Sequence, residues 1–443
     1  LETLVKRGYT ELPRFGFVPV NVPGAPAGWV ALSERFGKLP LREVFAPAIF
    51  YAEEGYPVSP ILATQWNRAF EIYQKQLKGD EFSEWFKTFA PQGRAPRAGE
   101  LVRLPNHAKT LSSIAETMGE AFYRGEIAQR IDAFSRQYGG FLRAEDLESF
   151  KAEWVDPIFT EYQGHEVWEI PPNGQGIVAL MALNILKGFA FEQNDKYTAL
   201  TYHRQIEAIK LAFADAQSNV TDPKHMQISV DDLLSEAWAH EKRKMIGRNA
   251  LLPPRSEETK GGTVYLTAAD GDGNMVSLIQ SNYMGFGSGL VVPGTGIGLH
   301  NRGHNFSFDP QHPNCLAPGK RPYHTIIPGF LTKDHKPLGP FGVMGGFMQP
   351  QGHVQVVMNL LDFGHNPQAA LDAPRFQWMR GKQVQVEKTL PHSIAQGLEE
   401  MGHEVKVTEG NAGYGRGQII LRLDNGALVG GTESRVDGTV AVW

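Results

Sequence analysis

The fold is decided by the stretch Gly261-Gly262-Thr263-Val264-Tyr265-Leu266-Thr267-Ala268-Ala269, followed by the turn Asp270-Gly271-Asp272-Gly273-Asn274. Val264, Leu266 and Ala268 alternate with Tyr265 and Thr267, which is the two-residue period of a strand. Glycine, aspartate and asparagine tolerate a positive φ, so the chain is expected to reverse at the turn. Residues 275–281 then run back as a second strand. The pattern predicts a β-hairpin.

The segment before this hairpin points to chemistry at Thr263. Residues 253–260 are polar and rich in proline, and they end at Gly261 and Gly262. The hydroxyl of Thr263 could attack the unhindered carbonyl of Gly262, and hydrolysis of the resulting ester would free the α-amine of Thr263. That amine titrates near neutrality and can act as the base for its own hydroxyl. We therefore predict self-cleavage between Gly262 and Thr263; on this stretch alone, an ordinary hairpin is the alternative.

Weaker motifs follow one another along the rest of the chain. They lie at residues 22–29, 37–41, 171–176, 202–216, 286–289, 318–322, 345–346, 372–375 and 430–438. In this order, and together with the Thr263 stretch, they resemble the γ-glutamyltranspeptidase family of N-terminal-nucleophile hydrolases over nearly the whole chain. The resemblance implies a large-subunit-like region, residues 1–262, and a small-subunit-like region, residues 263–443, cut from one precursor. Whether such pairs form a dimer stays open.

The same resemblance implies an α+β fold, a four-layer αββα sandwich with helices outside two stacked antiparallel sheets. The residue pattern alone predicts only a mixed α+β protein with a strand-rich second half. Apolar spacing predicts helices at 31–36, 41–53, 61–78, 106–134, 177–189, 202–216, 365–380 and 391–402. Strands are predicted at 154–159 and 164–170, and a final hairpin at 418–423 and 427–429.

Three further residues have catalytic roles by the resemblance. Ser281 falls where a hydroxyl residue hydrogen-bonds the free amine of the nucleophile; its plain alternative is a strand hydroxyl. Gly345 and Gly346 are the candidate oxyanion hole, because residues without side chains can direct backbone N–H groups at a developing oxyanion. Losing one such donor typically costs about 2.7–4 kcal/mol. A tight turn between strands is the alternative for this pair.

The residues expected to bind substrate depart from the transpeptidase pattern. Tyr283 stands where transpeptidases commonly carry a substrate-binding asparagine, and Asn282 is one place away. His304 and Asn305 replace two acidic residues that contact the α-amino group of a γ-glutamyl substrate. Asn305 cannot supply the charge-assisted bond of about 1.5–3 kcal/mol that a carboxylate gives. Arg302 could clamp a carboxylate bidentately, or it could form a solvated or structural ion pair.

His324 and Thr325 replace a serine pair that binds the substrate carboxylate in transpeptidases. The His-Thr form, with residues 344–346 and 349–351, resembles the side branch that includes oxamate amidohydrolase. The expected partner is therefore a small-molecule amide. A γ-glutamyl compound such as glutathione comes first, and a carboxylate-bearing amide such as oxamate second, with hydrolysis or transfer to an amino acid both open. A non-enzymatic binding or remnant protein is the third hypothesis.

One glycine-containing turn, residues 171–176, leads into the apolar helix predicted at 177–189. Its exposed backbone N–H groups could hold an anion. No phosphate-loop lysine follows, so a packing turn beside the sheet is favoured. His203, on the next predicted helix, is interpreted as a histidine whose hydrogen bonds are satisfied, because no set of residues at metal-ligand spacing accompanies it.

Composition limits the remaining classes. The 443 residues carry a net charge of −5 with interspersed signs, so no basic surface suggests nucleic acid, and no apolar run is long enough for a membrane span. Cys315 is the only cysteine, so no internal disulfide forms. No cofactor or metal is expected. The sequence starts at Leu1, inside the family's large subunit, so we expect a preceding segment with core strands and a carboxylate-binding arginine; localisation cannot be read.

Overall fold

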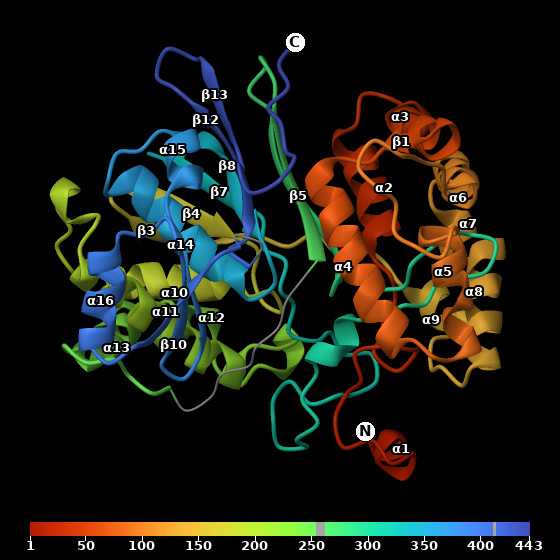
Figure 1. The fold of residues 1–443 in the computed structure, drawn as a ribbon, viewed down its shortest axis with the longest axis horizontal. Coiled ribbons are helices and arrows are strands. Elements are labelled where there is room, and N and C mark those ends of the chain that lie inside the picture. The colour runs from red at the N-terminus through yellow and green to blue at the C-terminus, as the bar shows by residue number, and fades with distance from the viewer. Residues whose placement is uncertain (254–261, 411–412) are drawn as a thin grey trace. The chain divides into compact units, whose positions relative to one another are not determined.

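Two compact units make up the part of the chain that the computed structural model describes, residues 1–253, 262–410 and 413–443. Unit 1 contains Val155–Ser281 and Phe306–Trp443, and unit 2 contains Glu2–Trp154 and Asn282–Asn305 (Figure 1). Gly261 and residues 254–260 of the polar segment before it lie outside the described residues. The units do not follow the predicted boundary between Gly262 and Thr263. That boundary concerns cleavage rather than folding, and it stays a prediction.

Unit 2 is mainly helical. Its helices and short strands are α1 (Glu2–Lys6), α2 (Ala25–Phe36), α3 (Leu41–Glu54), β1 (Tyr56–Pro57), α4 (Pro60–Gln76), η1 (Asp80–Phe82), α5 (Ser83–Phe89), β2 (Leu101–Val102), α6 (Pro105–Glu116), α7 (Glu120–Tyr123), α8 (Glu126–Gln137), α9 (Ala144–Ser149) and η4 (Arg302–Asn305). The single helix predicted over 106–134 is wrong, because α6, α7 and α8 replace it. Gly119 has a φ of +79° at the first break, a conformation that ends a right-handed helix.

Unit 1 combines sheets and helices. Its elements before Thr263 are β3 (Ile158–Tyr162), β4 (His165–Glu169), α10 (Gly176–Leu186), η2 (Gln193–Asp195), α11 (Ala199–Asn219), η3 (Pro223–His225), α12 (Val230–Leu233) and α13 (Glu236–Met245). The later ones are β5 (Gly262–Ala269), β6 (Met275–Tyr283, which runs on into unit 2), β7 (Gly329–Lys333), β8 (Lys336–Met344), α14 (Met348–Leu361), α15 (Pro367–Asp372), β9 (Phe376–Arg380), β10 (Gln383–Glu387), α16 (His392–Glu400), β11 (Glu404–Thr408), β12 (Arg416–Arg422) and β13 (Leu428–Thr432).

A six-stranded sheet organises unit 1. Its strand order is β13-β12-β8-β7-β4-β3, and neighbouring strands are antiparallel. Strands β3 and β4 come before Thr263 and the other strands after it, so both parts of the chain share one sheet. The predicted hairpin is present as β5 and β6, and β5 packs on β8 and β12. The smaller sheet β11-β10-β9 includes one parallel pair, β10 with β11.

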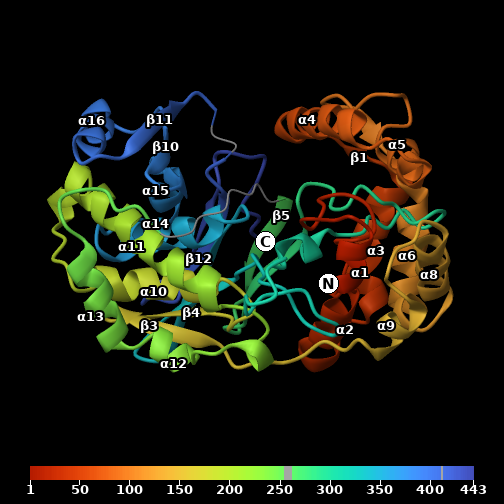
Figure 2. The same ribbon diagram turned by 90° about the horizontal axis from the view of Figure 1, so that it is seen from below.

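The hairpin and helix α14 lie on opposite faces of the six-stranded sheet, as Figures 1 and 2 show. A Cβ at Gly342 would lie 2.5 Å from the ring of Tyr265 on β5, so this residue faces the hairpin. The next residue, Val343, meets Gly352 of α14. Successive residues of a strand point to opposite faces. Unit 1 is therefore layered, with hairpin, sheet and helices in that order.

The core of unit 1 explains its most apolar helix. Every residue of α10 is buried, and α10 packs against α11, α13, α14 and the strands β3 and β4. Residues from before Thr263, such as Ile206, and from after it, such as Val343 and Met358, belong to one hydrophobic cluster. Because both parts of the chain contribute, neither can bury its apolar surface alone. No helix in the described ranges has the length and apolarity to cross a bilayer.

Two further predictions of secondary structure need correction, and most others are confirmed. The helix predicted at 365–380 ends as α15 at Asp372, and β9 follows it, because Pro374 cannot continue a helix and also restricts Ala373 before it. The strand predicted at 154–159 is displaced to β3. The hairpin at 418–429 is confirmed as β12 and β13.

Candidate functional site

Thr263 stands second in β5, at the position that the sequence predicts for the nucleophile. It is half-buried, and its Oγ1 donates a hydrogen bond of 3.0 Å to Oγ of Ser281 on the neighbouring strand β6. The resemblance implies that Ser281 hydrogen-bonds the α-amine of Thr263 that cleavage would free. In the uncut chain Ser281 accepts a hydrogen bond from the hydroxyl of Thr263 instead. The hairpin thus brings the two hydroxyls together.

The position of Thr263 depends on the close approach of the hairpin to the sheet. Tyr265, two residues further along β5, is buried, and its hydroxyl lies 2.8 Å from Oγ of Ser277 on β6. Its ring occupies the space that a side chain at Gly342 would need. Any larger residue at Gly342 would push the hairpin away, so this glycine is required for the packing of β5 on β8.

Gly345 and Gly346 follow β8 and lead into helix α14. Their φ values are +145° and +63°, which favour glycine. Their carbonyls accept hydrogen bonds from the N–H groups of Met348 (3.1 Å) and Gln349 (3.2 Å), so both carbonyls point into α14. In a trans peptide the N–H points opposite to the C=O. The amides of Gly346 and Phe347 therefore point out of the helix N-terminus, which suits a developing oxyanion.

The turn at residues 171–176 is a packing turn. The N–H of Gln175 donates to the carbonyl of His324 (2.9 Å), and the N–H of His324 donates to the carbonyl of Asn173 (2.9 Å). The amide of Gln175 is therefore used inside the protein. The side chain of Gln175 is fully buried and donates from Nε2 to the carbonyls of Thr325 (2.7 Å) and Gly346 (2.8 Å).

Gln175 is the residue that sequence reasoning missed in this region. It connects the segment of His324 and Thr325 with the turn at Gly345 and Gly346. Its two partners, Thr325 and Gly346, are 150 and 171 residues away in the sequence. Thr325 is buried, and His324 is half-buried. The one local signal is a polar amide directly before a helix that is apolar except for Asn184. Nothing in the sequence indicates its partners.

The remaining predicted substrate residues lie in unit 2. Tyr283 is completely buried with a φ of +74°, an uncommon conformation for a residue with a side chain. Its hydroxyl donates to Oδ1 of Asn305. The guanidinium of Arg302 lies over its ring, 4.4 Å from the centroid. Asn282 is exposed, and its carbonyl accepts from the N–H of Asn301 (3.3 Å).

Arg302 makes a structural contact in this cluster. It is buried, and burial lowers the pKa of its guanidinium to about 10. Stacking on an aromatic face is a favourable use of a poorly hydrated guanidinium. The sequence left a solvated or structural ion pair as the alternative for Arg302, and the contact described here is a stack on the ring of Tyr283. The role of Arg302 as a clamp for a substrate carboxylate stays a prediction.

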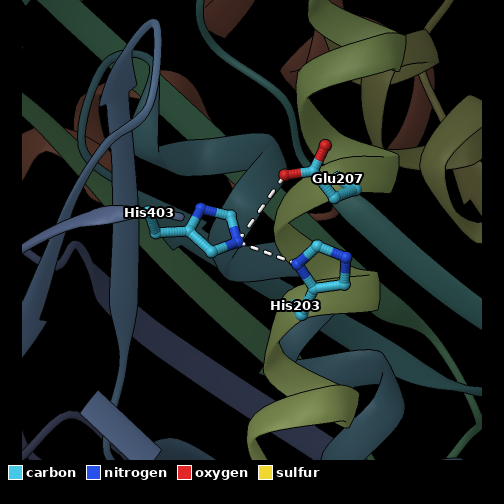
Figure 3. A group of neighbouring side chains, drawn as sticks. All are labelled: His203, Glu207 and His403. Carbon is cyan, nitrogen blue, oxygen red and sulfur yellow. Dashed lines mark hydrogen bonds and ion pairs between the residues drawn. The ribbon is translucent and has the colours of Figure 1, made fainter. Parts of the chain in front are cut away.

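A second cluster of titratable groups joins α11 to the residue before β11. His203 Nδ1 lies 2.9 Å from His403 Nε2, and His403 Nε2 lies 3.6 Å from Glu207 Oε1 (Figure 3). His203 Nε2 donates to the carbonyl of Gly247 (3.0 Å), so its Nδ1 is the acceptor and His403 Nε2 is the donor. Both ring nitrogens of His203 are thus hydrogen-bonded, as expected for a satisfied histidine.

Nothing in the sequence indicates that these three side chains meet, because His403 is 200 residues from His203. Two imidazoles and a carboxylate within 4.8 Å are a donor set that zinc uses. However, the buried ammonium of Lys210 already lies 2.8 Å from Glu207 Oε1. A dication would place two unbalanced positive charges in the core. We interpret the cluster as a hydrogen-bonded network that holds Gly247 and Leu251 against α11.

This network predicts a loss of stability in mild acid. Burial, together with Lys210 and His203, lowers the pKa of His403 to about 3, and burial lowers the pKa of His203. The unfolded histidine binds its proton near pH 6.5, so stability is fully present above that pH. It falls as pH drops, by up to about 1.4 kcal/mol per pH unit for each histidine. When the pH is lowered from about 7 to about 5, the urea concentration at the unfolding midpoint should fall less for His403→Gln than for the wild type. Equal losses would contradict this assignment.

Comparisons with known proteins agree with this geometry. The family described as Gamma-glutamyltranspeptidase matches residues 2–443. The glutathione hydrolase-like YwrD proenzyme of Bacillus subtilis is 34% identical, with 98% of this chain and 83% of the relative covered. The oxamate amidohydrolase proenzyme of Klebsiella pneumoniae is 33% identical, with the same coverage of both.

One solved structure is much more similar. The crystal structure of a cephalosporin acylase from Bacillus halodurans has 60% sequence identity and a TM-score of 0.96, covering 100% of this chain and 82% of the other. The resemblance drawn from the sequence, including its side branch, is confirmed. The mixed α/β architecture with antiparallel sheets is also confirmed. The chain belongs to the γ-glutamyltranspeptidase family.

Proposed function

We propose that this chain is a self-processing amidohydrolase with Thr263 as its N-terminal nucleophile. The observation that carries the proposal is the Thr263 hydroxyl held by Ser281 at the start of β5. After cleavage, the hydroxyl attacks the amide carbonyl carbon of a substrate and its proton passes to the α-amine of Thr263. The C–N bond then breaks, and the leaving amine takes that proton. Water attacks the remaining ester and frees the acid and the hydroxyl.

The amides that follow β8 are proposed to stabilise the oxyanion in both acyl-transfer steps. Gly345 and Gly346 are the predicted donors. The direction of the Gly345 carbonyl into α14 supports this role for the amide of Gly346, which shares its peptide plane. The amide of Phe347 is added as a donor, because it shares a peptide plane with the Gly346 carbonyl. The same donors would serve the first event, the attack of Thr263 on Gly262.

The two pieces produced by cleavage are proposed to stay together as large and small subunits. The shared hydrophobic cluster and the mixed six-stranded sheet of unit 1 support this, since separation would expose both. We also propose that the complete architecture is the four-layer αββα sandwich. The three layers already described, hairpin, sheet and helices, support it.

For the acyl group, we propose one that has a carboxylate and lacks an α-ammonium. His304 and Asn305 stand where transpeptidases have acidic residues. Asn305 accepts a hydrogen bond from the Tyr283 hydroxyl, and a neutral amide cannot balance a buried ammonium. The oxamate amidohydrolase and cephalosporin acylase names of the relatives also support an acyl group other than γ-glutamyl. A γ-glutamyl compound such as glutathione is the second candidate, supported by the glutathione hydrolase-like relative.

A pair of chromogenic amides tests the acyl specificity. Glutaryl-p-nitroanilide and γ-glutamyl-p-nitroanilide have the same leaving group and differ only by the α-ammonium. We expect kcat/KM to be about 10-fold or more higher for the glutaryl compound. This is the effect of one charge-assisted bond that the ammonium of the γ-glutamyl compound cannot make with a neutral Asn305. Oxamate, followed by ammonia release, is measured alongside.

A charge introduced at Asn305 provides the matched variant. Asn305→Asp should shift the preference toward the γ-glutamyl compound by about 10-fold, because the new carboxylate can pair with its ammonium. Asn366→Asp makes the same charge change at the N-cap of α15, where aspartate is tolerated, and should leave the ratio unchanged. A wild-type preference for the γ-glutamyl compound would favour the second candidate. An uncut, inactive chain would support the non-enzymatic hypothesis.

A further inference from the structure

The buried side chain of Gln175 has no role in its own helix. Gln175 is the N-cap residue of α10, yet its side chain makes no capping hydrogen bond. Both of its amide hydrogens go to carbonyls of distant segments, Thr325 and Gly346, and its Oε1 lies 3.5 Å from the hydroxyl of Tyr323. A fully buried amide with these partners is fixed in its orientation, because any rotation would leave a polar group unpaired.

The contact with Gly346 determines the direction of a peptide plane. The Gly346 carbonyl accepts from both Gln175 Nε2 (2.8 Å) and the N–H of Gln349 (3.2 Å). A glycine with a φ of +63° has few steric limits of its own, so hydrogen bonds must select its conformation. The Gly346–Phe347 peptide is planar, and fixing its carbonyl therefore fixes the N–H of Phe347.

The contact with Thr325 couples a second segment to the same side chain. Two hydrogen bonds hold the backbone of residues 322–325. Asn173 Nδ2 donates to the carbonyl of Pro322 (2.6 Å), and the N–H of Gln175 donates to the carbonyl of His324 (2.9 Å). Gln175 Nε2 donates a hydrogen bond to the next carbonyl, that of Thr325. One amide thus holds the segment predicted to bind the substrate carboxylate and the turn predicted to bind the oxyanion.

We propose that Gln175 is a positioning residue for the reaction, which sets the orientation of the oxyanion-binding amide of Phe347 by bridging Thr325 and Gly346. This inference rests on the proposed function. Displacing a catalytic group by about 1 Å can cost on the order of 100-fold in rate. Since the amides act mainly in the transition state, the loss should fall on kcat rather than on KM.

The test replaces Gln175 by an apolar side chain of similar length. Gln175→Met should lower kcat by about 10- to 100-fold, leave KM within about 3-fold, and slow cleavage before Thr263. Gln355→Met is the matched control. Gln355 is also buried and also donates from Nε2 to two carbonyls, those of Gln351 and Phe376, but it joins α14 to β9. It should lose similar thermal stability and keep its kcat.

The outcomes separate this inference from the function on which it rests. If the wild type is neither cut nor active on any of the three amides, the proposed function fails, and this inference fails with it. If the wild type is active and Gln175→Met matches it, or matches Gln355→Met, the inference alone is overturned. Should Gln175→Met not fold, Gln175→Asn decides, because its shorter amide cannot reach both carbonyls. A loss of kcat with retained KM supports the role, and an unchanged kcat contradicts it.

Discussion

Replacing Thr263 by alanine is expected to give a single uncut chain without amidase activity. The variant lacks the hydroxyl that we propose attacks the Gly262 carbonyl and later the substrate. In enzymes with a covalent intermediate, losing the nucleophile lowers kcat by a factor on the order of 10³ to 10⁶. Denaturing electrophoresis and intact-mass measurement would show residues 1–443 together in the variant, and residues 1–262 and 263–443 separately in the wild type.

Two variants show whether this effect belongs to the hydroxyl of Thr263. Thr263→Ser keeps a hydroxyl and the future amine, so cutting and turnover should both persist. Thr267→Ala removes a hydroxyl from the same half-buried face of β5 and should be cut at the wild-type rate. Cutting of the alanine variant before residue 263 would overturn the mechanism.

Replacing Glu433 by glutamine is expected to destabilise the fold by about 3–5 kcal/mol, the usual cost of breaking a buried ion pair from one side. Glu433 is 1% exposed and receives Arg375 Nη2 (2.8 Å) and Arg435 Nη1 (2.6 Å) on its two oxygens. It also accepts from the N–H of Gly417 (2.9 Å). In the variant the guanidinium of Arg435 keeps its ion pair with Glu387, whereas that of Arg375 loses its ion-pair partner and keeps hydrogen bonds to the carbonyls of Tyr414 and Leu371.

Urea denaturation at neutral pH measures this effect. The control is Glu241→Gln, which removes an exposed ion pair with Lys244 and should change stability by less than about 1 kcal/mol. A loss at Glu433 no larger than at Glu241 would contradict the assignment. The network also explains two motifs that the sequence singled out, residues 372–375 and 430–438, because Arg375 from the first pairs with Glu433 from the second.

Local sequence determined the hairpin, the family and most helices of this protein. The alternation from Val264 to Ala268 and the glycine-rich turn are encoded within a few residues of each other, so β5 and β6 could be predicted. The helix predicted at 106–134 failed for a local reason too, since the left-handed glycine at 119 interrupts a continuous apolar pattern. Order among motifs then identified the family, which no single motif could do.

The face of the hairpin that meets the sheet could not be read from its pattern. Val264 is 58% exposed and Leu266 42% exposed, whereas Tyr265 is buried. A two-residue period predicts two faces but does not say which one is covered. The space left by Gly342 on β8 decides this, and Gly342 is 77 residues away from Tyr265 in the printed sequence.

The sequence by itself determined the candidate nucleophile, the glycine turn and the absence of acidic residues at 304 and 305, because each is a matter of residue type at one place. Only the tertiary structure decided that Ser281 meets the Thr263 hydroxyl, that Gln175 bridges Thr325 and Gly346, and that Arg302 stacks on Tyr283. The physical reason is that hydrogen bonds and packing depend on distance in space. The packing of helices and strands brings together residues whose separation along the chain leaves no local pattern.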